Sequence, residues 1–520
     1  MSNRRSGFRQ EVRAAARVVA VALLASVAWA APAWRETGRF LLDGEPAESL
    51  DGALVAADGT VLAWGNAWDT PAAHPAVALD AIGREPDAKP SLLGERPEPA
   101  SLSAPDDPLR TGFFVELGTD LKPKGGARFP TGLATVDAAT FAADGGLITA
   151  GSARKGFDAL VPPAKLRVVA PRSNDARFGK IVCRGVEMPG DVYVARWRAD
   201  RRGIEWAVLL KAHRKPPEAL SFGADGRLYF QSRSLYALAA DGTAQDLGWA
   251  EGPAETSSRS FAAAHPSRDA LLSCGWKVTS DGGRQWVGPV VEELNLAGKP
   301  RQRFYDWTGA LVGCHGIGLT HPCPIVHGAW MPDGAIVVAA CTRSEKVVLT
   351  ADATDPTVLL KSAKDSSPIE PLPWFLTVER APRGIHFARF DPRAAGKGVW
   401  TRLMSPDAEK HWVGELVISG MSAAPDGRLA VCGEMDLVEL FGDGAQRRAM
   451  ASDSQGFVAV LAPDLTVLLR PMPLPGMLAR RATLSGPDML VAGCLVEKRK
   501  KGSTERAVKP AIGCLLKLSP

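Results

Sequence analysis

After residue 30, the sequence lacks any segment long and apolar enough to form a membrane-spanning helix, which needs roughly 20 residues. It also lacks G-x-S-x-G, H-E-x-x-H, Walker and Rossmann patterns in a suitable context, and it has no D-x-[DN]-x-[DN]-G calcium loop. These absences remove the usual routes from a motif to a named reaction. We therefore predict no catalytic residues, no cofactor and no membrane span.

A large excess of charge of one sign is also missing from most of the chain. The formal net charge is +5, but the first thirty residues contain five arginines and only one glutamate. Residues 31–520 are therefore close to neutral, at about +1. This balance gives no reason to expect a nucleic-acid partner or an anionic membrane surface.

The first thirty residues have the layout of a secretory signal. A basic start is followed by the apolar run Val18–Ala28, and Ala28-Trp29-Ala30 is a small-x-small cleavage site. We predict a signal peptide at residues 1–30 and an exported protein, periplasmic or extracellular, of bacterial type. Residues 31–520 are predicted to form a single domain.

Cysteine is scarce, with eight residues in the chain, which is too few for a fold held mainly by disulfides. The densest segment is CHGIGLTHPCPIVH, which contains Cys314, His315, His321, Cys323 and His327. Three interpretations remain open: a Cys314–Cys323 disulfide, a transition-metal site on the three histidines, or packing residues without a special role. Elsewhere, Cys494 and Cys514 are predicted to lie on neighbouring strands and are a second candidate disulfide.

Glycine (52) and proline (40) are frequent, and the apolar runs are short, which favours β structure with many turns. One phrase occurs seven times. It consists of a strand with small residues, an Asp-Gly or similar turn, and a second apolar strand. Its copies surround Asp58, Asp144, Asp225, Asp269, Asp333, Asp426 and Asp488. A phrase repeated at long spacing indicates a repeat architecture.

Each phrase predicts a hairpin, because Asp-Gly tolerates the backbone of a tight turn. Most copies are followed by a second hairpin, such as GFVAVLAPDLTVLLRP at residues 456–471. Two hairpins make a four-stranded antiparallel blade, and seven blades around an axis make an all-β propeller. The last copy lacks a fourth strand, and the spare strand Gly38–Asp43 is predicted to supply it beside Ala511–Pro520.

The spacing of the phrase is irregular. The intervals from Asp58 to Asp144 and from Asp333 to Asp426 are 86 and 93 residues, long enough to hold another blade, so eight blades are the alternative. Residues 81–109 are rich in proline and charge and are predicted to be an excursion from the domain.

The pattern resembles the bacterial seven-bladed β-propeller repeat family (SBBP-like repeats), in which a strand-DG-strand unit precedes an F-V-A-x-L-x-x-D-G-like hairpin. The segment TSDGGRQW, residues 279–286, also resembles an Asp-box, with Gln285 where threonine is usual. Asp-boxes recur in sialidases, but this chain has only four tyrosines and no FRIP-like start to its first blade, which argues against that activity.

In a propeller, the connection into the innermost strand of each blade opens near the central channel, where ligands commonly bind. This places five residues as candidate ligand-binding groups: Asp137, Arg259, His327, Arg480 and Arg481. The alternative is that these polar residues are merely solvated. We predict an exported binding or scaffold protein for a small molecule, glycan or protein. The alternative is a periplasmic hydrolase or lyase acting on a sugar, lactone or peptide at the channel mouth.

Overall fold

The structure is a computed structural model. It describes residues 34–42, 48–68, 80–81, 110–130, 132–170, 182–183, 186–187, 191–211, 216–232, 234–250, 257–281, 284–305, 311–312, 326–342, 384–391, 399–404, 414–441, 448–496 and 510–520. The proposed signal and nearly all of the segment 81–109 lie outside these ranges, so both stay predictions.

The repeated phrase forms hairpins, as predicted, and one copy shows why. The amide of Ala142 donates to the carbonyl of Gly146, and the amide of Gly145 donates back to Ala142. Gly145 has φ 80°, which glycine adopts without steric cost. Asp144 caps the turn, because its Oδ1 accepts a hydrogen bond from the amide of Gly146 at 3.0 Å.

Each of the seven phrases forms the first hairpin of a sheet of four or five strands. We number these sheets I to VII in the order of the phrases. Sheet I contains β2 (Glu48–Val55), β3 (Val61–Trp68), β5 (Arg110–Leu117), β6 (Pro123–Arg128) and β4 (Asp80–Ala81). Sheet II contains β7 (Ala138–Phe141), β8 (Leu147–Ala153), β12 (Asp191–Trp197), β13 (Ile204–Leu210) and β9 (Leu166–Val169). Sheet III contains β14 (Leu220–Phe222), β15 (Leu228–Ser232), β16 (Ser234–Leu238) and β17 (Ala244–Ala250).

The second half of the chain forms four further sheets, each built around the first hairpin of its phrase. Sheet IV contains β18 (Ser257–Ala264), β19 (Leu271–Asp281), β20 (Arg284–Leu294), β21 (Pro300–Tyr305) and β22 (Leu311–Val312). Sheet V contains β23 (Val326–Trp330), β24 (Ile336–Thr342), β25 (Gly384–Phe390) and β26 (Val399–Met404). Sheet VI contains β27 (Gly414–Ala423), β28 (Leu429–Phe441), β29 (Arg448–Leu461) and β30 (Val467–Leu474). Sheet VII contains β31 (Met477–Ser485), β32 (Asp488–Val496), β33 (Pro510–Ser519) and β1 (Arg35–Leu41).

The remaining described elements are small. They are the pair β10 (Val182–Cys183) and β11 (Val186–Glu187), and the 3₁₀ helices η1 (Phe157–Leu160) and η2 (Pro163–Lys165). Neither of these helices is long and apolar enough to cross a membrane.

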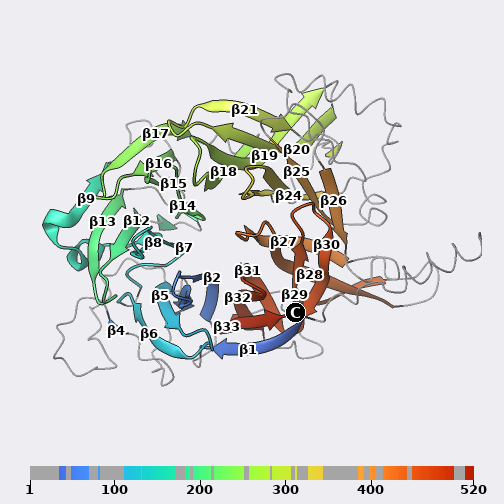
Figure 1. Cartoon of the computed structure of the whole chain (residues 1–520), viewed down its shortest axis with the longest axis horizontal. Coiled ribbons are helices and arrows are strands. Elements are labelled where there is room, and N and C mark those ends of the chain that lie inside the picture. The colour runs from blue at the N-terminus through green and yellow to red at the C-terminus, as the bar shows by residue number, and fades with distance from the viewer. Residues whose placement is uncertain are drawn as a thin grey trace, which may run out of the picture.

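The sheets are arranged as a β-propeller. Figure 1 shows them around a common centre, with the first strand of each sheet nearest that centre. These first strands contact one another in the cyclic order β2, β7, β14, β18, β23, β27, β31 and back to β2. The described part of the chain is therefore all-β, apart from the two short 3₁₀ helices.

The hydrophobic core lies between neighbouring sheets rather than at the centre. One cluster of buried apolar side chains joins each adjacent pair, from sheets I and II around to sheets VII and I. Between sheets I and II, for example, the rings of Phe114 and Trp197 meet edge to face at 4.7 Å. Burying each such side chain stabilises the fold by about 1.5–3 kcal/mol.

The first and last strands of the described chain lie side by side. Strand β1 pairs antiparallel with β33, with Arg39 opposite Leu516 and Phe40 opposite Leu515. The amide of Leu42 continues the pairing by donating to the carbonyl of Gly513 at 3.0 Å. These are the two segments whose pairing the repeat pattern predicts.

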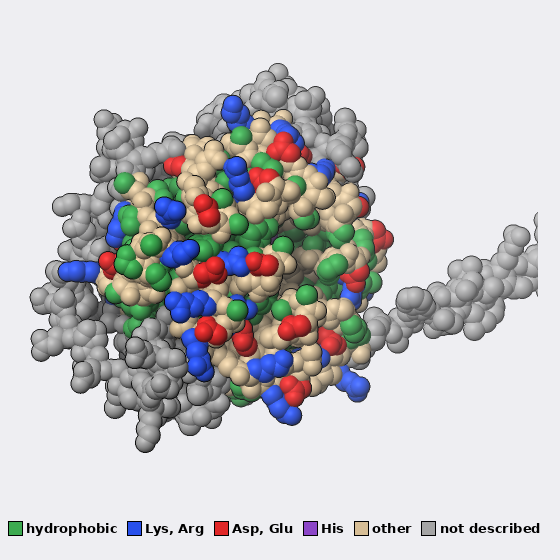
Figure 2. Space-filling view, turned by 60° about the vertical axis from the view of Figure 1, so that its left-hand side comes forward, with side chains coloured by type: hydrophobic (Ala, Val, Ile, Leu, Met, Phe, Trp, Pro, Cys, Tyr) green, Lys and Arg blue, Asp and Glu red, His purple; other side chains and the backbone are tan. Residues whose placement is uncertain are grey.

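The described surface carries charges of both signs. On the face shown in Figure 2, basic and acidic side chains are interspersed. Arg196, for example, bridges Asp144 and Glu205 at 2.5 and 3.0 Å. This face agrees with the near-neutral charge of residues 31–520 and shows no broad basic area.

Candidate functional site

Polar side chains lie in or just before the first strands of several sheets. Asp51, Asp137, Glu218 and Arg481 each lie seven residues before the turn aspartate of their own hairpin, in sheets I, II, III and VII. Because these strands contact one another around the centre, residues at the same offset from the turn are brought towards the axis of the ring.

Asp51 is positioned by a β-bulge and by a buried amide. The pairing of β2 with β3 shifts between Leu50 and Gly52, which leaves Asp51 outside the ladder. The carboxyl group of Asp51 accepts hydrogen bonds from Ser49 Oγ at 3.0 Å and from Asn66 Nδ2 at 2.8 Å. Burial raises the pKa of Asp51, and these two hydrogen bonds oppose the rise.

Asn66 connects this aspartate to the next sheet. Besides bonding Asp51, its Nδ2 donates to the carbonyl of Val136 at 3.1 Å, and its Oδ1 accepts the amide of Val136 at 3.0 Å. The residue that follows Val136 is Asp137, so the amide of Asn66 fixes the two carboxyl groups relative to each other.

Asp137 lies just before β7 and is held by Thr135. The hydroxyl of Thr135 donates to Asp137 Oδ2 at 2.5 Å and accepts the amide of Ser152 at 2.8 Å. The pKa of Asp137 is raised to about 6, chiefly by burial; the hydrogen bond from Thr135 opposes this rise and the nearby charge of Asp51 adds to it.

Arg481 reaches from sheet VII to sheet III, which are not neighbours in the ring. Its Nη2 donates to the backbone carbonyl of Glu218 at 3.3 Å. Its guanidinium also lies over the indole ring of Trp64, 5.5 Å from the ring centre. Burial lowers the pKa of Arg481, whereas the charges of Asp51 and Glu218 raise it.

His327 enters the same region from β23 in sheet V. The backbone carbonyl of Ile418 accepts a hydrogen bond from its ring, and its Nε2 is buried without a hydrogen-bond partner among the described residues. Burial lowers the pKa of His327, Glu218 raises it and Arg481 lowers it. Burial thus favours the neutral ring of His327, and with Nδ1 as the donor to Ile418 its Nε2 carries a lone pair.

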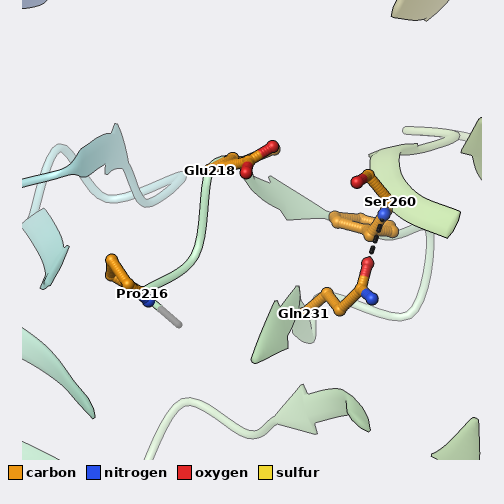
Figure 3. A pocket seen from close by; sticks show the side chains of 6 residues that line it. Pro216, Glu218, Gln231 and Ser260 are labelled. Atoms are coloured by element: carbon orange, nitrogen blue, oxygen red, sulfur yellow. Dashed lines mark hydrogen bonds between the residues drawn. The ribbon is translucent and has the colours of Figure 1, made fainter. Parts of the chain in front are cut away.

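A pocket open to solvent adjoins Glu218. It is shallow, with room for about one water molecule, and is lined by Pro216, Glu218, Ala219, Gln231, Ser260 and Phe261. Figure 3 shows the carboxyl group of Glu218 and the hydroxyl of Ser260 directed towards each other at one side of this pocket. The side chain of Gln231 is fixed below them, because its Oε1 accepts the amide of Phe261 at 2.6 Å.

The structure brings three of the five predicted ligand-binding residues into one region and does not do so for the other two. Asp137, His327 and Arg481 occupy one electrostatically connected region through Asp51 and Glu218. Arg480 is more exposed, and its Nη1 lies 3.6 Å from Glu434 Oε1. Arg259 lies in β18 opposite Gly275, but its side chain is outside the described residues.

The predicted metal and disulfide segment cannot be placed. Cys314, His315, His321 and Cys323 all lie outside the described ranges, so their three interpretations stay predictions. Among the residues that the structure does describe, no group of three or more His, Cys, Asp or Glu side chains is arranged to hold a metal ion.

The proposed Cys494–Cys514 disulfide is wrong, because both cysteines are free and buried. Strands β32 and β33 do pair, but Cys494 lies opposite Gly513 and Cys514 lies opposite Gly493. Side chains one position apart along a strand point to opposite faces of a sheet, so the two sulfur atoms do not face each other.

Sequence reasoning missed Asp51, Asn66 and Glu218. The signal for Asp51 and Glu218 was present, because both share with Asp137 the offset of seven residues before the turn aspartate. For Asn66 no comparable signal exists, since its role depends on the backbone of Val136, 70 residues away.

The arrangement could bind and orient polar groups. It offers hydrogen-bond donors at Arg481, acceptors at Glu218 and His327, and the Asp137 carboxyl, whose pKa is raised to about 6. These groups come from sheets that are far apart in sequence, so a ligand at the axis would contact several sheets at once.

No protein-family model matches the sequence, and no curated protein matches it. Among solved structures, the chain is similar to Drosophila Semaphorin 1b, extracellular domains 1–2, with a TM-score of 0.38 and 9% identity, covering 93% of this chain and 87% of that one. Drosophila Plexin A in complex with Semaphorin 1b matches with a TM-score of 0.36, 9% identity and the same coverages. An ACO/RPE65 chimera matches with a TM-score of 0.29 and 11% identity, covering 93% and 79%. Likenesses this weak carry no inference about what the protein binds.

Proposed function

We propose that this chain is an exported β-propeller that binds a ligand or partner at the axial end where the first strands begin. The observation that carries the proposal is the convergence of Arg481, Glu218 and His327 from sheets VII, III and V. A fold needs no such convergence for stability, because its core lies between adjacent sheets. Polar groups that converge from several sheets, some with shifted pKa values, are typical of binding sites.

The ring itself is proposed to have seven blades, one for each of sheets I to VII, with β1 closing sheet VII. Two features support this count: the cyclic contacts of the seven first strands and the pairing of Phe40 with Leu515. The relation to the SBBP-like repeat family is likewise a proposal, supported by the recurrence of the Asp-Gly hairpin.

Export is proposed on the layout of residues 1–30. If the protein is expressed with those residues in a bacterial host, we expect it in the periplasm or medium with its new N-terminus at Ala31. Cytoplasmic retention of the uncleaved chain would argue against export.

The binding proposal is tested by a thermal-shift screen with glycans, small organic acids and short peptides. We expect ligands that raise the melting temperature of the wild type, and we expect the effect to be lost in Asp137→Asn or Arg481→Gln. Glu205→Gln is the control. Glu205 lies at the opposite end of sheet II from Asp191, and we expect this variant to keep the effect. Ligands that stabilise the wild type and all three variants equally would place binding elsewhere.

A hydrolase or lyase remains a second candidate, favoured by one observation. Asp137, with a pKa of about 6 beside the Asp51 carboxyl, meets the requirement for a general acid or base near neutral pH. Turnover of chromogenic glycosides or lactones that disappears in Asp137→Asn, with a pH dependence centred near 6, would support this function. Absence of turnover across such a panel would leave binding alone.

A further inference from the structure

Trp64, in β3 of sheet I, connects the hydrophobic core to the axial end of the ring. Its side chain is fully buried and belongs to the apolar cluster between sheets I and II. The guanidinium of Arg481, which comes from sheet VII, lies over the same indole ring, 5.5 Å from the ring centre. Trp64 is therefore a core residue that also contacts a polar residue of the proposed binding site.

Gly52 allows the indole ring to take this position. Trp64 lies opposite Gly52 in the pairing of β3 with β2. A Cβ at Gly52 would overlap the indole atoms Cζ2 and Cη2 of Trp64, so a larger residue there would have to move the ring. An aromatic side chain that covers a cross-strand glycine shields its backbone and pins the register of the two strands. The ring is thus fixed over the residue that follows Asp51 in the chain.

The two residues after Trp64 fit the same stretch of β2. A Cβ at Gly65 would overlap the carbonyl oxygen of Ser49, so the two backbones approach closely at this point. The next residue, Asn66, bonds the carboxyl group of Asp51 at 2.8 Å. Three consecutive residues therefore hold the β-bulge at Asp51, and Trp64 is the one of them over which Arg481 lies.

The indole N–H of Trp64 indicates that stacking, rather than a hydrogen bond, orients the ring. Its Nε1 is buried without a hydrogen-bond partner among the described residues. A buried indole usually finds an acceptor for this group, because leaving it unpaired costs free energy. The observed orientation gives up that bond and keeps the ring against Gly52 and under the guanidinium of Arg481.

The guanidinium of Arg481 has few other contacts that could fix its direction. Among the described residues, its hydrogen bond to the carbonyl of Glu218, 3.3 Å long, is the only one, and it forms no ion pair. Its neighbour Arg480 is held differently, because its Nη1 lies 3.6 Å from Glu434 Oε1. An arginine side chain loses much rotamer freedom when it is held in one direction, so a single hydrogen bond is a weak restraint. The indole ring of Trp64 supplies a second restraint.

We propose that Trp64 is a positioning residue of the axial site. Its indole ring, fixed over Gly52, holds the guanidinium of Arg481 in the direction that crosses the axis to Glu218. The importance of that direction rests on the binding function proposed above, but the contact between the two side chains can be tested without a ligand.

A double-mutant cycle on the full chain tests the contact, with the equilibrium constant of unfolding measured by urea denaturation. Relative to Arg481→Gln, we expect Arg481 to stabilise the fold about threefold more in the wild type than in Trp64→Leu, because leucine offers the cation no ring face. Trp64→Phe, which keeps a smaller ring, should restore part of this difference. Arg480→Gln is the matched control, and its effect should be the same in both backgrounds.

Gly52→Ala provides a second form of the test, because it leaves Trp64 in place but displaces the ring. It should reduce the effect of Arg481→Gln as Trp64→Leu does, and it serves if Trp64→Leu does not fold, which circular dichroism checks. Gly125→Ala is its control, since a Cβ at Gly125 would meet no atom within 4 Å. An effect of Arg481→Gln that is the same in the wild type, Trp64→Leu and Gly52→Ala would overturn the proposal.

The role in binding is separated from the contact by the thermal-shift screen. For a ligand whose effect is lost in Arg481→Gln, we expect the shift in melting temperature to be lost in Trp64→Leu and partly kept in Trp64→Phe. A full shift in Trp64→Leu would show that Trp64 does not position Arg481 for binding. Coupling in the cycle without any axial ligand would keep the contact and remove the binding function.

Discussion

At the scale of single residues, Asn66 shows how one buried amide joins two sheets. Only 1% of its surface is exposed, and its side chain bonds both Asp51 and the backbone of Val136. Removing this side chain would leave the amide and carbonyl of Val136 without these partners inside the fold, which costs more than losing a surface hydrogen bond.

We therefore expect Asn66→Ala to lower the free energy of unfolding by about 2–3 kcal/mol, measured by urea denaturation. Asn295→Ala is the control, because Asn295 caps an exposed turn through the amide of Ala297. Its expected cost is about 0.5–1 kcal/mol. Equal losses for the two variants would contradict the role given to Asn66.

Asp137 makes stability depend on pH in an unusual direction. Its pKa is about 6 in the folded chain, above the ordinary value of 3.8. The folded state therefore binds the proton more tightly than the unfolded state, and its stability falls as the pH rises from about 4 to about 6. Asp137→Asn removes this loss, so we expect the variant to be more stable than wild type by about 1–3 kcal/mol at pH 7.5, and the difference to vanish below pH 4.

Asp144 is the matched control, because it lies in the first hairpin of the same sheet. Hydrogen bonds from Arg196 and from the amide of Gly146 lower its pKa, so the carboxylate is favoured in the folded state. Asp144→Asn should thus destabilise at pH 7.5, with the effect lost as the pH falls through the lowered pKa. Thermal unfolding from pH 2 to 8 measures both variants, and the same sign for both at pH 7.5 would refute this assignment.

At the scale of elements, the hairpins were the most predictable part of the fold. The Asp-Gly phrase specifies both a capping carboxylate and a left-handed glycine, and both depend only on local sequence. The structure shows this at Gly59, Gly145, Gly226, Gly334 and Gly427, all with φ between 73° and 84°.

The backbone strain of a residue other than glycine at a positive φ can be measured by comparing substitutions at two glycines. A Cβ at Gly226 or at Gly125 would meet no atom within 4 Å, but only Gly226 has a positive φ, of 73°. We expect Gly226→Ala to lower the free energy of unfolding by about 1 kcal/mol, and Gly125→Ala, within β6, to leave it unchanged or raise it slightly. Equal effects in urea denaturation would show that the backbone conformation is not the cause.

The site was predictable only in part. Asp137, His327 and Arg481 were found because each lies in or just before a first strand, a position that the repeated phrase reveals. The reach of Arg481 across to the carbonyl of Glu218 could not be predicted, because it depends on the width of the ring. The error over Cys494 and Cys514 has a similar cause, since a register difference of one residue reverses the face of a side chain.

At the scale of the whole molecule, the repeat count predicted seven first hairpins, and the structure describes a sheet at each of them. Residues 343–383, in the longest interval between phrases, lie outside the described ranges. Only the described sheets therefore bear on the eight-bladed alternative. The first strands of these sheets contact one another in a cycle.

The pairing of the two ends is tested by a single substitution. Leu41 lies directly opposite Cys514, which is free. Opposite residues of an antiparallel pair have Cα atoms about 4.5–5.5 Å apart, within the range of a disulfide. We expect Leu41→Cys to cross-link to Cys514 under a mild oxidant and to raise the melting temperature, with the linked peptide identified by mass spectrometry.

Arg39→Cys is the control for this cross-link, because Arg39 lies opposite Leu516, two positions from Cys514. It should remain reduced under the same conditions. Failure of Leu41→Cys to link, or equal linking of both variants, would contradict the register and with it the proposed closure.

The side-by-side position of β1 and β33 has a consequence for how the protein is made. Strand β1 is synthesised long before β33, so sheet VII cannot be completed while β33 is still inside the ribosome. Until β33 has emerged, β1 and β32 both lack it as a neighbour, and their unpaired edges are open to association with other chains. A protein built in this way benefits from being kept unfolded until its whole length has emerged.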